Sequence, residues 1–388
     1  MRVLQVTGSS AGGVGRHARE ISRMLAEPDP DLGADTAGHT VLLAGPADVV
    51  AAVAPPVRTA VVEITDRPRP QDARVVAELR RLAAGADVVH AHGLRAGGLA
   101  AMAVATLADG PRLIVTLHNL PVGGRAVQTV AAGLERLVAG SADVVLGVSG
   151  DLVERMRERG APRAVRALVP APDRMPTGID PGELRASLGM APGERLLVTV
   201  ARLAPQKGLD LLLDVAAVLR GPRTTRRTGR HAQAASGWRW VILGDGPLRG
   251  HVAARASAED LPVHLAGHRD DAPDLMAAAD VVVSTARWEG QPLWLQEALR
   301  AGAAVVATDV GGTAEVTGDA AVLVPPGDSD RLAEAVREVL ADPERQTELR
   351  DAARARAATL PGPDDVRAQL EEIYGTSGDD VPRSAAGG

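Results

Sequence analysis

The sequence predicts an α/β fold in which two doubly wound parallel sheets, each covered by helices, follow one another along the chain. Strand candidates are short, nearly all-apolar runs, as expected of strands that are buried on both faces. They alternate with longer Ala-, Leu- and Arg-rich helical patterns. The alternation stops at residues 169–181, which carry four prolines, and then restarts, so that this stretch is predicted to link two domains.

The first half of the chain alternates clearly. Each strand candidate is a run rich in Val, Leu or Ile, and each helix candidate repeats its apolar residues every three to four positions. These patterns predict strands at residues 2–7, 40–44, 60–64, 87–90, 112–117 and 143–148, and helices at 14–26, 71–84, 97–108, 125–139 and 149–159.

The second half repeats this plan. A last amphipathic helix is expected at 364–374, where Val366, Leu370 and Ile373 share one face. The polar segment 221–237 is expected to be a surface insertion, and residues 376–388 a disordered tail. Strands are predicted at 196–200, 240–243, 263–266, 281–284, 304–308 and 321–324, and helices at 209–219, 248–259, 273–279, 293–300, 328–340 and 343–358.

We therefore expect domains at residues 1–174 and 182–360, with the helix at 364–374 free to return to the first domain. Two such domains leave a cleft. Ligands of open α/β sheets bind outside the carboxyl ends of the strands, so that chemistry is expected in the loops that follow strands.

Composition excludes several classes of function. The net charge is −6, with 43 basic and 49 acidic residues, which argues against a nucleic-acid binder. The absence of cysteine excludes disulfides, thiolate zinc sites and cysteine nucleophiles. The chain opens as a strand pattern without a signal peptide, and no apolar run is long enough to span a membrane, so we expect a cytoplasmic protein.

In the first domain, glycines and histidines follow the strands. Gly12 and Gly13 end a glycine-rich loop before a helix, where the backbone can approach an anion. A dinucleotide fingerprint would need glycine at position 18, which is alanine. His90 and His92 come after the fourth strand, and with no third ligand at a sensible spacing we predict no metal. His118 follows the fifth strand and is a candidate for the cleft.

In the second domain, Arg202 and Lys207 lie between the first strand and its helix. Two cations there can hold a diphosphate, and Lys207 is the only lysine of the chain. The alternative is a pair of solvated surface charges. Gly244 opens a Gly-Asp-Gly-Pro turn after the next strand, which keeps the backbone close to a neighbour.

The most informative stretch is residues 288–297, WEGQPLWLQE. Glu289 follows a strand, Gly290 permits close approach, and Pro292 is expected at the first helical position. The free N–H groups of residues 293 and 294 suit a phosphate. Glu297, about one turn further on, would be repelled by that phosphate unless it binds hydroxyl groups, which indicates sugar or ribose recognition.

Taken together, these residues resemble family 4 of the glycosyltransferases, whose GT-B fold has two facing Rossmann-like domains. The resemblance covers residues 1–374 without the insertion. It rests on motifs that occur in the family's order: Gly12-Gly13, His118, Arg202 with Lys207, Gly244–Pro247, Glu289 with Glu297, and Gly311-Gly312 with Glu315.

The resemblance implies that the second domain binds a nucleotide-diphosphate sugar and the first domain the acceptor. Arg202 and Lys207 would hold the diphosphate, Glu297 the ribose, and the loop at His268 the base. His118 and Glu289 would act at the transferred sugar. The other donor-binding residues implied are Gly12, Gly13, Gly244, Gly290, Gln291, Pro292 and Leu293.

The family retains the anomeric configuration and needs neither metal nor cofactor. This sequence departs from the family pattern at Gln291, where phenylalanine is frequent, and in the linker, which lacks the usual Pro-Asn-Gly-Val-Asp. The Asp-x-Asp sequences at 29–31 and 328–330 do not follow a strand of the cleft, so that they are not expected to hold a metal.

Three other functions stay open. A nucleotide-sugar epimerase would need an acid/base set in the first domain, where His90, His92 and His118 are the candidates. A non-catalytic nucleotide-sugar binder would not need the full set of donor residues. An NAD-dependent oxidoreductase is disfavoured because no acidic residue ends the second strand. The acceptor is not encoded in a motif, and a lipid-linked acceptor would bring the protein to a membrane surface.

Overall fold

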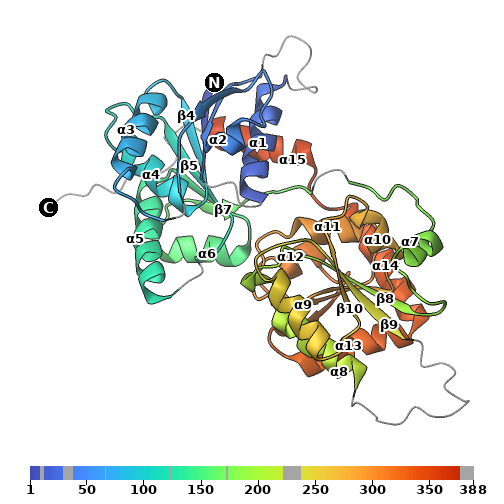
Figure 1. Ribbon diagram of the computed structural model, residues 1–388. Helices are drawn as coiled ribbons and strands as arrows, with labels where there is room; N and C mark the ends of the chain where they lie inside the picture. Colours follow the sequence, from blue (N-terminus) through green and yellow to red (C-terminus); the bar gives the residue numbers. More distant parts are fainter. Residues whose placement is uncertain are drawn as a thin grey trace, which may run out of the picture. The chain divides into compact units, whose positions relative to one another are not determined.

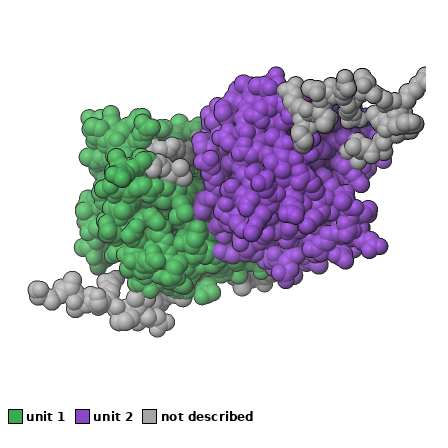
Figure 2. Space-filling model, turned by 90° about the horizontal axis from the view of Figure 1, so that it is seen from below, with its two compact units in different colours: residues 1–169, 361–388 green, residues 170–360 purple. Residues whose placement is uncertain are grey.

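The computed structural model describes residues 1–8, 13–28, 38–65, 67–121, 124–171, 174–221 and 237–375 (Figure 1). The chain divides into two compact units, coloured separately in Figure 2. Unit 1 comprises residues 1–169 with the segment from 361 onward, and unit 2 comprises residues 170–360. Most of the expected insertion at 221–237 and all of the tail at 376–388 lie outside the described residues.

Unit 1 is built on a parallel sheet, as predicted. In its described part, seven strands lie in the order β3-β2-β1-β4-β5-β6-β7. The strands in the middle of this sheet are buried along nearly their whole length, which explains their apolar sequences. The strands are β1 (Arg2–Thr7), β2 (Thr40–Gly45), β3 (Arg58–Val61), β4 (Val88–His92), β5 (Arg112–Leu117), β6 (Val144–Gly147) and β7 (Ala164–Arg166).

Helices cover both faces of this sheet. Gly97 and Gly98 of α4 pack so closely on Val115 and Leu134 that a Cβ at either glycine would come within 2.6 Å of those side chains. Helices α4 and α5 therefore cover the face that carries Val115. The helices of this unit are α1 (Gly13–Ala26), α2 (Ala47–Val50), α3 (Asp72–Ala83), α4 (Leu94–Val104), α5 (Arg125–Ser141), α6 (Gly150–Glu158) and α15 (Pro363–Gly375).

The C-terminal helix α15 belongs to unit 1, although all of unit 2, residues 170–360, precedes it. Arg367 donates to the carbonyl oxygens of Met24, in the last turn of α1, and of Glu27, just after this helix. Gln369 bonds the backbone of residues 166 and 168. Val366, Leu370 and Ile373 are buried, as the amphipathic pattern predicts. Helix α15 thus lies on the same face of the sheet as α1.

Unit 2 repeats the plan with a second parallel sheet. Within its described residues, six strands lie in the order β10-β9-β8-β11-β12-β13 around a core that includes the fully buried Trp240. The strands are β8 (Arg195–Val200), β9 (Trp238–Leu243), β10 (Val263–Gly267), β11 (Val281–Ser284), β12 (Val305–Thr308) and β13 (Val322–Val324). The helices are α7 (Pro181–Ser187), α8 (Leu209–Arg220), α9 (Arg249–Ala258), α10 (Ala272–Ala278), α11 (Leu293–Arg300), α12 (Thr313–Thr317), α13 (Ser329–Ala341) and α14 (Pro343–Ala357).

The doubly wound α/β prediction is confirmed for both units, and most expected elements match within a few residues. Strand β3 begins and ends earlier than the predicted strand at 60–64, because its described partner β2 ends at Gly45 and the pairing stops at Val61. Helix α4 begins at Leu94 and not at residue 97. Gly97 and Gly98 therefore lie inside the helix, where they allow its close packing and do not mark its start. The short elements α2, β7, α7 and α12 were not predicted.

Strand β4 is longer than predicted, and this correction bears on the site. The sequence placed His92 in the loop after the fourth strand. In the structure β4 runs to His92, whose neighbours in the sheet are Thr7 of β1 and Thr116 of β5.

No helix that the structure describes is both long and apolar enough to cross a membrane.

Candidate active site

Three loops meet at the carboxyl edge of the sheet in unit 2. They follow β8, β11 and β12, and two glycines show how tightly they are packed. Gly208 has φ +62°, and a Cβ there would lie 1.9 Å from the carbonyl oxygen of Thr285. Gly311 has φ +50°, and a Cβ there would lie 1.8 Å from the carbonyl oxygen of Glu289. Only glycine therefore fits at these two contacts.

The central contact of these loops is an ion pair between Lys207 and Glu289. The Lys207 Nζ atom lies 2.5 Å from Glu289 Oε1, and the side chains are 18 % and 7 % exposed. Two backbone contacts hold them in place: the Thr285 hydroxyl donates to the Lys207 carbonyl, and the Gly312 N–H donates to the Glu289 carbonyl. The pair therefore places one cation and one anion side by side in a largely desolvated position.

Helix α11 starts directly beside this pair. Trp294 Nε1 lies 3.4 Å from Glu289 Oε1, and Glu297, in the next turn, is also buried. Pro292 precedes the helix as its N-cap in an extended conformation, so that its predicted place at the first helical position is wrong by one residue. The helix begins at Leu293, and its first N–H groups supply positive partial charge close to Glu289.

The remaining donor-binding candidates of unit 2 lie in the loops after β8, β9, β10 and β11. Arg202 is exposed, and its side chain makes no hydrogen bond or ion pair with another described residue, so that the structure does not pair it with Lys207. Gly244 has φ +135°, and a Cβ there would lie 2.1 Å from the Ala201 carbonyl oxygen, which confirms the expected close approach. Gly290 is buried, Gln291 is half-buried, and the His268 side chain is 78 % exposed.

In unit 1, Gly12 lies outside the described residues and Gly13 begins α1. His118 lies just beyond the end of β5, as predicted. It is not isolated, because the rings of His17 on α1 and His92 on β4 have their centroids 5.1 Å and 5.7 Å from its own. The sequence did not associate His17 with the other histidines.

A buried hydrogen-bond network continues from these histidines to the C-terminal helix. Tyr374, the only tyrosine, lies 2.7 Å from His90 Nδ1 and accepts from Gln5 Nε2 at 3.1 Å. Gln5 Oε1 lies 2.8 Å from His92 Nε2, and His90 Nε2 lies 2.6 Å from the Thr116 hydroxyl. Burial of its hydroxyl raises the pKa of Tyr374.

Burial also keeps the histidines neutral. It lowers the pKa of His17 to about 4 and, together with the nearby His17, that of His90 to about 3. Burial and the neighbouring histidines hold the pKa of His92 and His118 well below the usual range. A neutral imidazole has one nitrogen without a proton, which can accept a proton or bind a metal.

The sequence patterns did not identify Gln5, Thr7, His17 or Tyr374 as residues of this region. A signal for the strand residues exists, because alternate residues of a strand share a face. Gln5 and Thr7, His90 and His92, and Thr116 and His118 are three such polar pairs in otherwise apolar runs. Nothing in the local pattern identifies His17 or Tyr374 as their neighbours.

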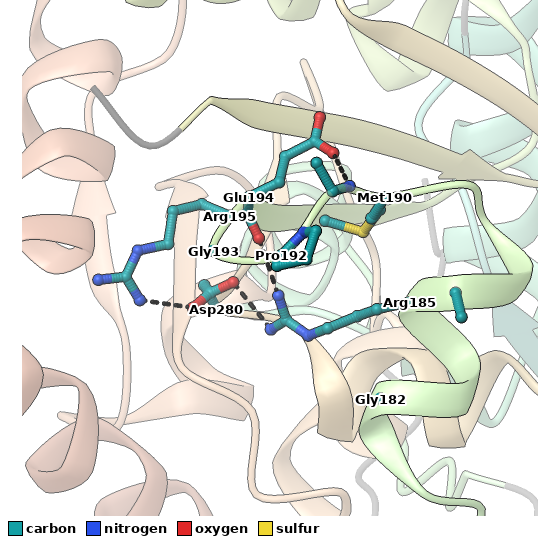
Figure 3. Close-up of a pocket in the computed structure, with 10 residues that line it drawn as sticks. Gly182, Arg185, Met190, Pro192, Gly193, Glu194, Arg195 and Asp280 are labelled. Atoms are coloured by element: carbon teal, nitrogen blue, oxygen red, sulfur yellow. Dashed lines mark hydrogen bonds and ion pairs between the residues drawn. The ribbon is translucent and has the colours of Figure 1, made fainter. Parts of the chain in front are cut away.

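A surface hollow of about 680 Å³ lies elsewhere in unit 2 (Figure 3). Its lining includes Asp280, which Arg185 Nη2 and Arg195 Nη1 both approach to 2.9 Å. Although burial opposes it, the Leu196 N–H and the two guanidinium groups hold the pKa of Asp280 below its usual range. Asp280 and Arg195 lie at the amino ends of β11 and β8, the edge opposite the Lys207–Glu289 pair, so the hollow is not the predicted site.

Comparison with known proteins agrees with this architecture. Residues 12–172 match the family model of the glycosyl transferase 4-like domain, and residues 194–342 match that of the glycosyl transferases group 1. A D-inositol 3-phosphate glycosyltransferase of Frankia alni is 31 % identical over 70 % of each chain. An alpha-D-kanosaminyltransferase of Streptomyces kanamyceticus is 28 % identical over 63 % of this chain, and the match spans 62 % of that relative's length.

Solved structures show the same fold. Anabaena Alr3699/HepE in complex with UDP and glucose superimposes with a TM-score of 0.74, covering 96 % of this chain and 99 % of that one. The sequence identity is 21 %, so that this likeness concerns the fold. The GT-B fold expected from the sequence is thereby confirmed.

Proposed function

The chain belongs to family 4 of the glycosyltransferases, and we propose that it is an enzyme that transfers a sugar from a nucleotide-diphosphate sugar to an acceptor hydroxyl. The observation that carries this proposal is the Lys207–Glu289 pair at the start of α11. Its cation, which we assign to the diphosphate, lies within hydrogen-bond distance of its carboxylate, which we assign to sugar hydroxyls. A site for only a phosphate or only a neutral sugar has no need of both charges.

In this proposal each residue of unit 2 has one role. Lys207 and the exposed Arg202 bind the diphosphate, and the first N–H groups of α11 at Leu293 add to them. Glu289 accepts hydrogen bonds from the transferred sugar, and Glu297 from the ribose. The loop that contains His268 lies against the base. The backbone from Gly290 to Leu293, including Gln291 and Pro292, and the turn at Gly244 complete the donor site.

In unit 1 we assign His118 to the transferred sugar and the loop with Gly12 and Gly13 to the diphosphate. A neutral imidazole suits this position, because a hydroxyl can donate to its bare nitrogen without bringing a second charge. The acceptor also belongs to unit 1 in this proposal. Its identity, and contact of the protein with a membrane surface on the cytoplasmic side, stay open to experiment.

We propose that the transfer retains the anomeric configuration and needs no metal. The bond between the anomeric carbon and the phosphate oxygen breaks, and its electron pair stays with the diphosphate. The acceptor oxygen then forms its bond from the same face and passes its proton to the departing phosphate. The cations at Arg202 and Lys207 stabilise the charge that develops on the diphosphate, which lowers the barrier.

The names of similar proteins suggest where to begin the test. HepE was solved with UDP and glucose, so that UDP-sugars are the first donors to try. A thermal-shift panel of nucleoside diphosphates and their sugars identifies the base, because a ligand that binds only the folded chain raises the melting temperature. The proposal fails if no nucleoside diphosphate stabilises the protein.

Product analysis separates this function from its alternatives. A donor incubated alone must yield no new sugar nucleotide, since an epimerase would produce one. With candidate acceptor alcohols the donor must yield a glycoside of unchanged configuration and a nucleoside diphosphate. EDTA must leave the rate unchanged. A rate that EDTA abolishes and Mn²⁺ or Mg²⁺ restores would refute the metal-independent mechanism.

A further inference from the structure

A cluster of three histidines in unit 1 goes beyond the proposed reaction. His17, His92 and His118 each offer a ring nitrogen, and these three atoms lie within 4.8 Å of one another. They come from α1, β4 and the end of β5, at the carboxyl edge of the sheet, where ligands of such folds bind. Neither the family models nor the names of similar proteins assign a metal to this position.

The hydrogen-bond network leaves one ring nitrogen bare on each of two of these histidines. His92 Nε2 is occupied by Gln5 Oε1, so that it carries the proton and Nδ1 has only a lone pair. His92 is 1 % exposed, and no described residue is a partner of its Nδ1 or of His118 Nε2. Buried polar atoms are normally paired, so two bare ones in one cluster indicate a ligand.

The fourth histidine of the region differs from these, because each of its ring nitrogens has a hydrogen-bond partner. Both ring nitrogens of His90 are occupied, one by the Tyr374 hydroxyl and one by the Thr116 hydroxyl. His90 is therefore structural. His92 and His118, by contrast, each have a buried ring nitrogen without a partner among the described residues.

We propose that His17, His92 and His118 form a binding site for one divalent transition metal ion, of which Zn²⁺ is the best fit. Three neutral imidazoles and one open position are a common zinc ligand set. Metal–nitrogen bonds of about 2.1 Å place tetrahedral ligands about 3.4 Å apart, so that nitrogens within 4.8 Å of one another must approach by at most about 1.4 Å. Rotation about the broad terminal torsion of each histidine provides that movement.

Gln5 acts as the positioning residue of this site. By accepting from His92 Nε2 it fixes the tautomer and aims Nδ1 at the cluster, as the outer partners of metal-bound histidines do. Gln5 is itself held by Tyr374. Tyr374 on α15 thus holds Gln5, and Gln5 orients His92 as a metal ligand.

Metal at this site has a consequence for transfer, and this part rests on the proposed function. A metal ion on His118 withdraws that imidazole from the sugar. We therefore expect Zn²⁺ to inhibit the enzyme, in agreement with a mechanism that needs no metal. At a free Zn²⁺ concentration ten times its dissociation constant, mutually exclusive binding lowers the rate about 10-fold.

The test measures binding of Zn²⁺ to the full-length chain by competition with a chromogenic chelator, and the visible spectrum of Co²⁺ as a probe of tetrahedral nitrogen ligands. We expect one equivalent, and at least about 100-fold weaker binding in His17→Gln and His92→Gln, since loss of even an outer partner costs 10- to 100-fold. His251→Gln, an exposed histidine of unit 2, is the matched control.

Circular dichroism checks that each variant folds, and the Co²⁺ spectrum of the wild-type chain requires no variant at all. The proposal is refuted if the wild-type chain gives no tetrahedral Co²⁺ band, or if binding is as strong in both variants as in the control. Tight binding that leaves transfer unaffected would uphold the metal site and contradict the role of His118 at the sugar.

Discussion

Lys207 Nζ lies 2.5 Å from Glu289 Oε1, although the two residues are 82 positions apart and lie in loops after different strands. The two charges neutralise each other when no ligand is bound. A diphosphate must therefore compete with Glu289 for the lysine, and a sugar must compete with Lys207 for the carboxylate. A donor that carries both groups satisfies both residues at once, which favours the intact sugar nucleotide over either fragment.

Replacement of Lys207 tests the cation of this pair. A charge-assisted hydrogen bond to the diphosphate contributes on the order of 1.5–3 kcal/mol, so that Lys207→Ala weakens binding of nucleoside diphosphates by roughly 10- to 150-fold. We expect Lys207→Arg to fold and to lose most of its activity, because the planar guanidinium cannot replace a compact ammonium group 2.5 Å from Glu289. Isothermal titration and initial rates measure both effects.

Arg345→Ala on α14 is the matched control, because this exposed arginine forms its ion pair with Glu348 on its own helix. It should bind and react as the wild-type chain does. If Lys207→Arg transfers sugar at the wild-type rate, Lys207 has no special role at the diphosphate and the assignment of the donor site is wrong.

Replacement of Glu289, the other residue of the ion pair, should not weaken the binding of nucleoside diphosphates as replacement of Lys207 does. In Glu289→Gln the amide no longer holds Lys207 as an ion pair, so that nucleoside diphosphates should bind as tightly as to the wild-type chain or more tightly. Transfer should fall at least about 100-fold, since the carboxylate that meets the sugar is lost. Titration with the diphosphate and the turnover rate with the sugar nucleotide separate the two effects. A parallel loss of diphosphate affinity would contradict this division of roles.

The sequence predicts the sheets and the loops of the site well, for a physical reason. Doubly buried strands must be short and apolar, and their carboxyl ends must carry the polar loops. The stretch from Glu289 to Glu297 could therefore be located at the end of a strand before a helix. That Glu289 pairs with Lys207 could not be foreseen, because the contact depends on how β8 and β11 lie side by side.

The histidine cluster shows the limit of local patterns. In the sequence the apolar run of the fourth strand ends at His90, which predicts a loop at His92. In the sheet, His92 has a strand on each side, and this pairing extends β4 by two residues. The third member, His17, comes from a helix 75 positions earlier, and no spacing rule connects the two.

Buried neutral histidines predict an acid-labile unit 1. The unfolded chain takes up protons below a pKa of about 6.5, whereas His17 and His90 in the folded chain do so only near 4 and 3. Stability is thus complete above pH 6.5 and is lost as the pH falls. Below pH 6.5 each of these histidines lowers the free energy of unfolding by about 1.4 kcal/mol per pH unit. At pH 5 the two together lower it by about 4 kcal/mol.

The chain provides its own control for this experiment, because all four tryptophans belong to unit 2. With EDTA present, acidification from pH 7 to pH 5 should lower the urea midpoint seen by far-ultraviolet circular dichroism more than the midpoint seen by tryptophan fluorescence. In His17→Gln the pH dependence should be about 1.4 kcal/mol per unit shallower. Equal shifts of the two signals would show that these histidines do not control the acid response.

The hydroxyl of Tyr374 should be important for the stability of unit 1. Tyr374→Phe keeps the ring but leaves His90 Nδ1 and Gln5 Nε2 without their partner in a buried position. An unpaired buried polar group costs about 1–3 kcal/mol, so that we expect a loss of at least 1 kcal/mol in the free energy of unfolding. Thr129→Val removes an exposed hydroxyl that bonds within α5 and should change this free energy by less than about 0.5 kcal/mol. The tryptophan signal of unit 2 should be the same in both variants. Stability equal to the wild type in Tyr374→Phe would mean that water replaces the hydroxyl, and that Gln5 and His90 do not depend on the last helix for their orientation.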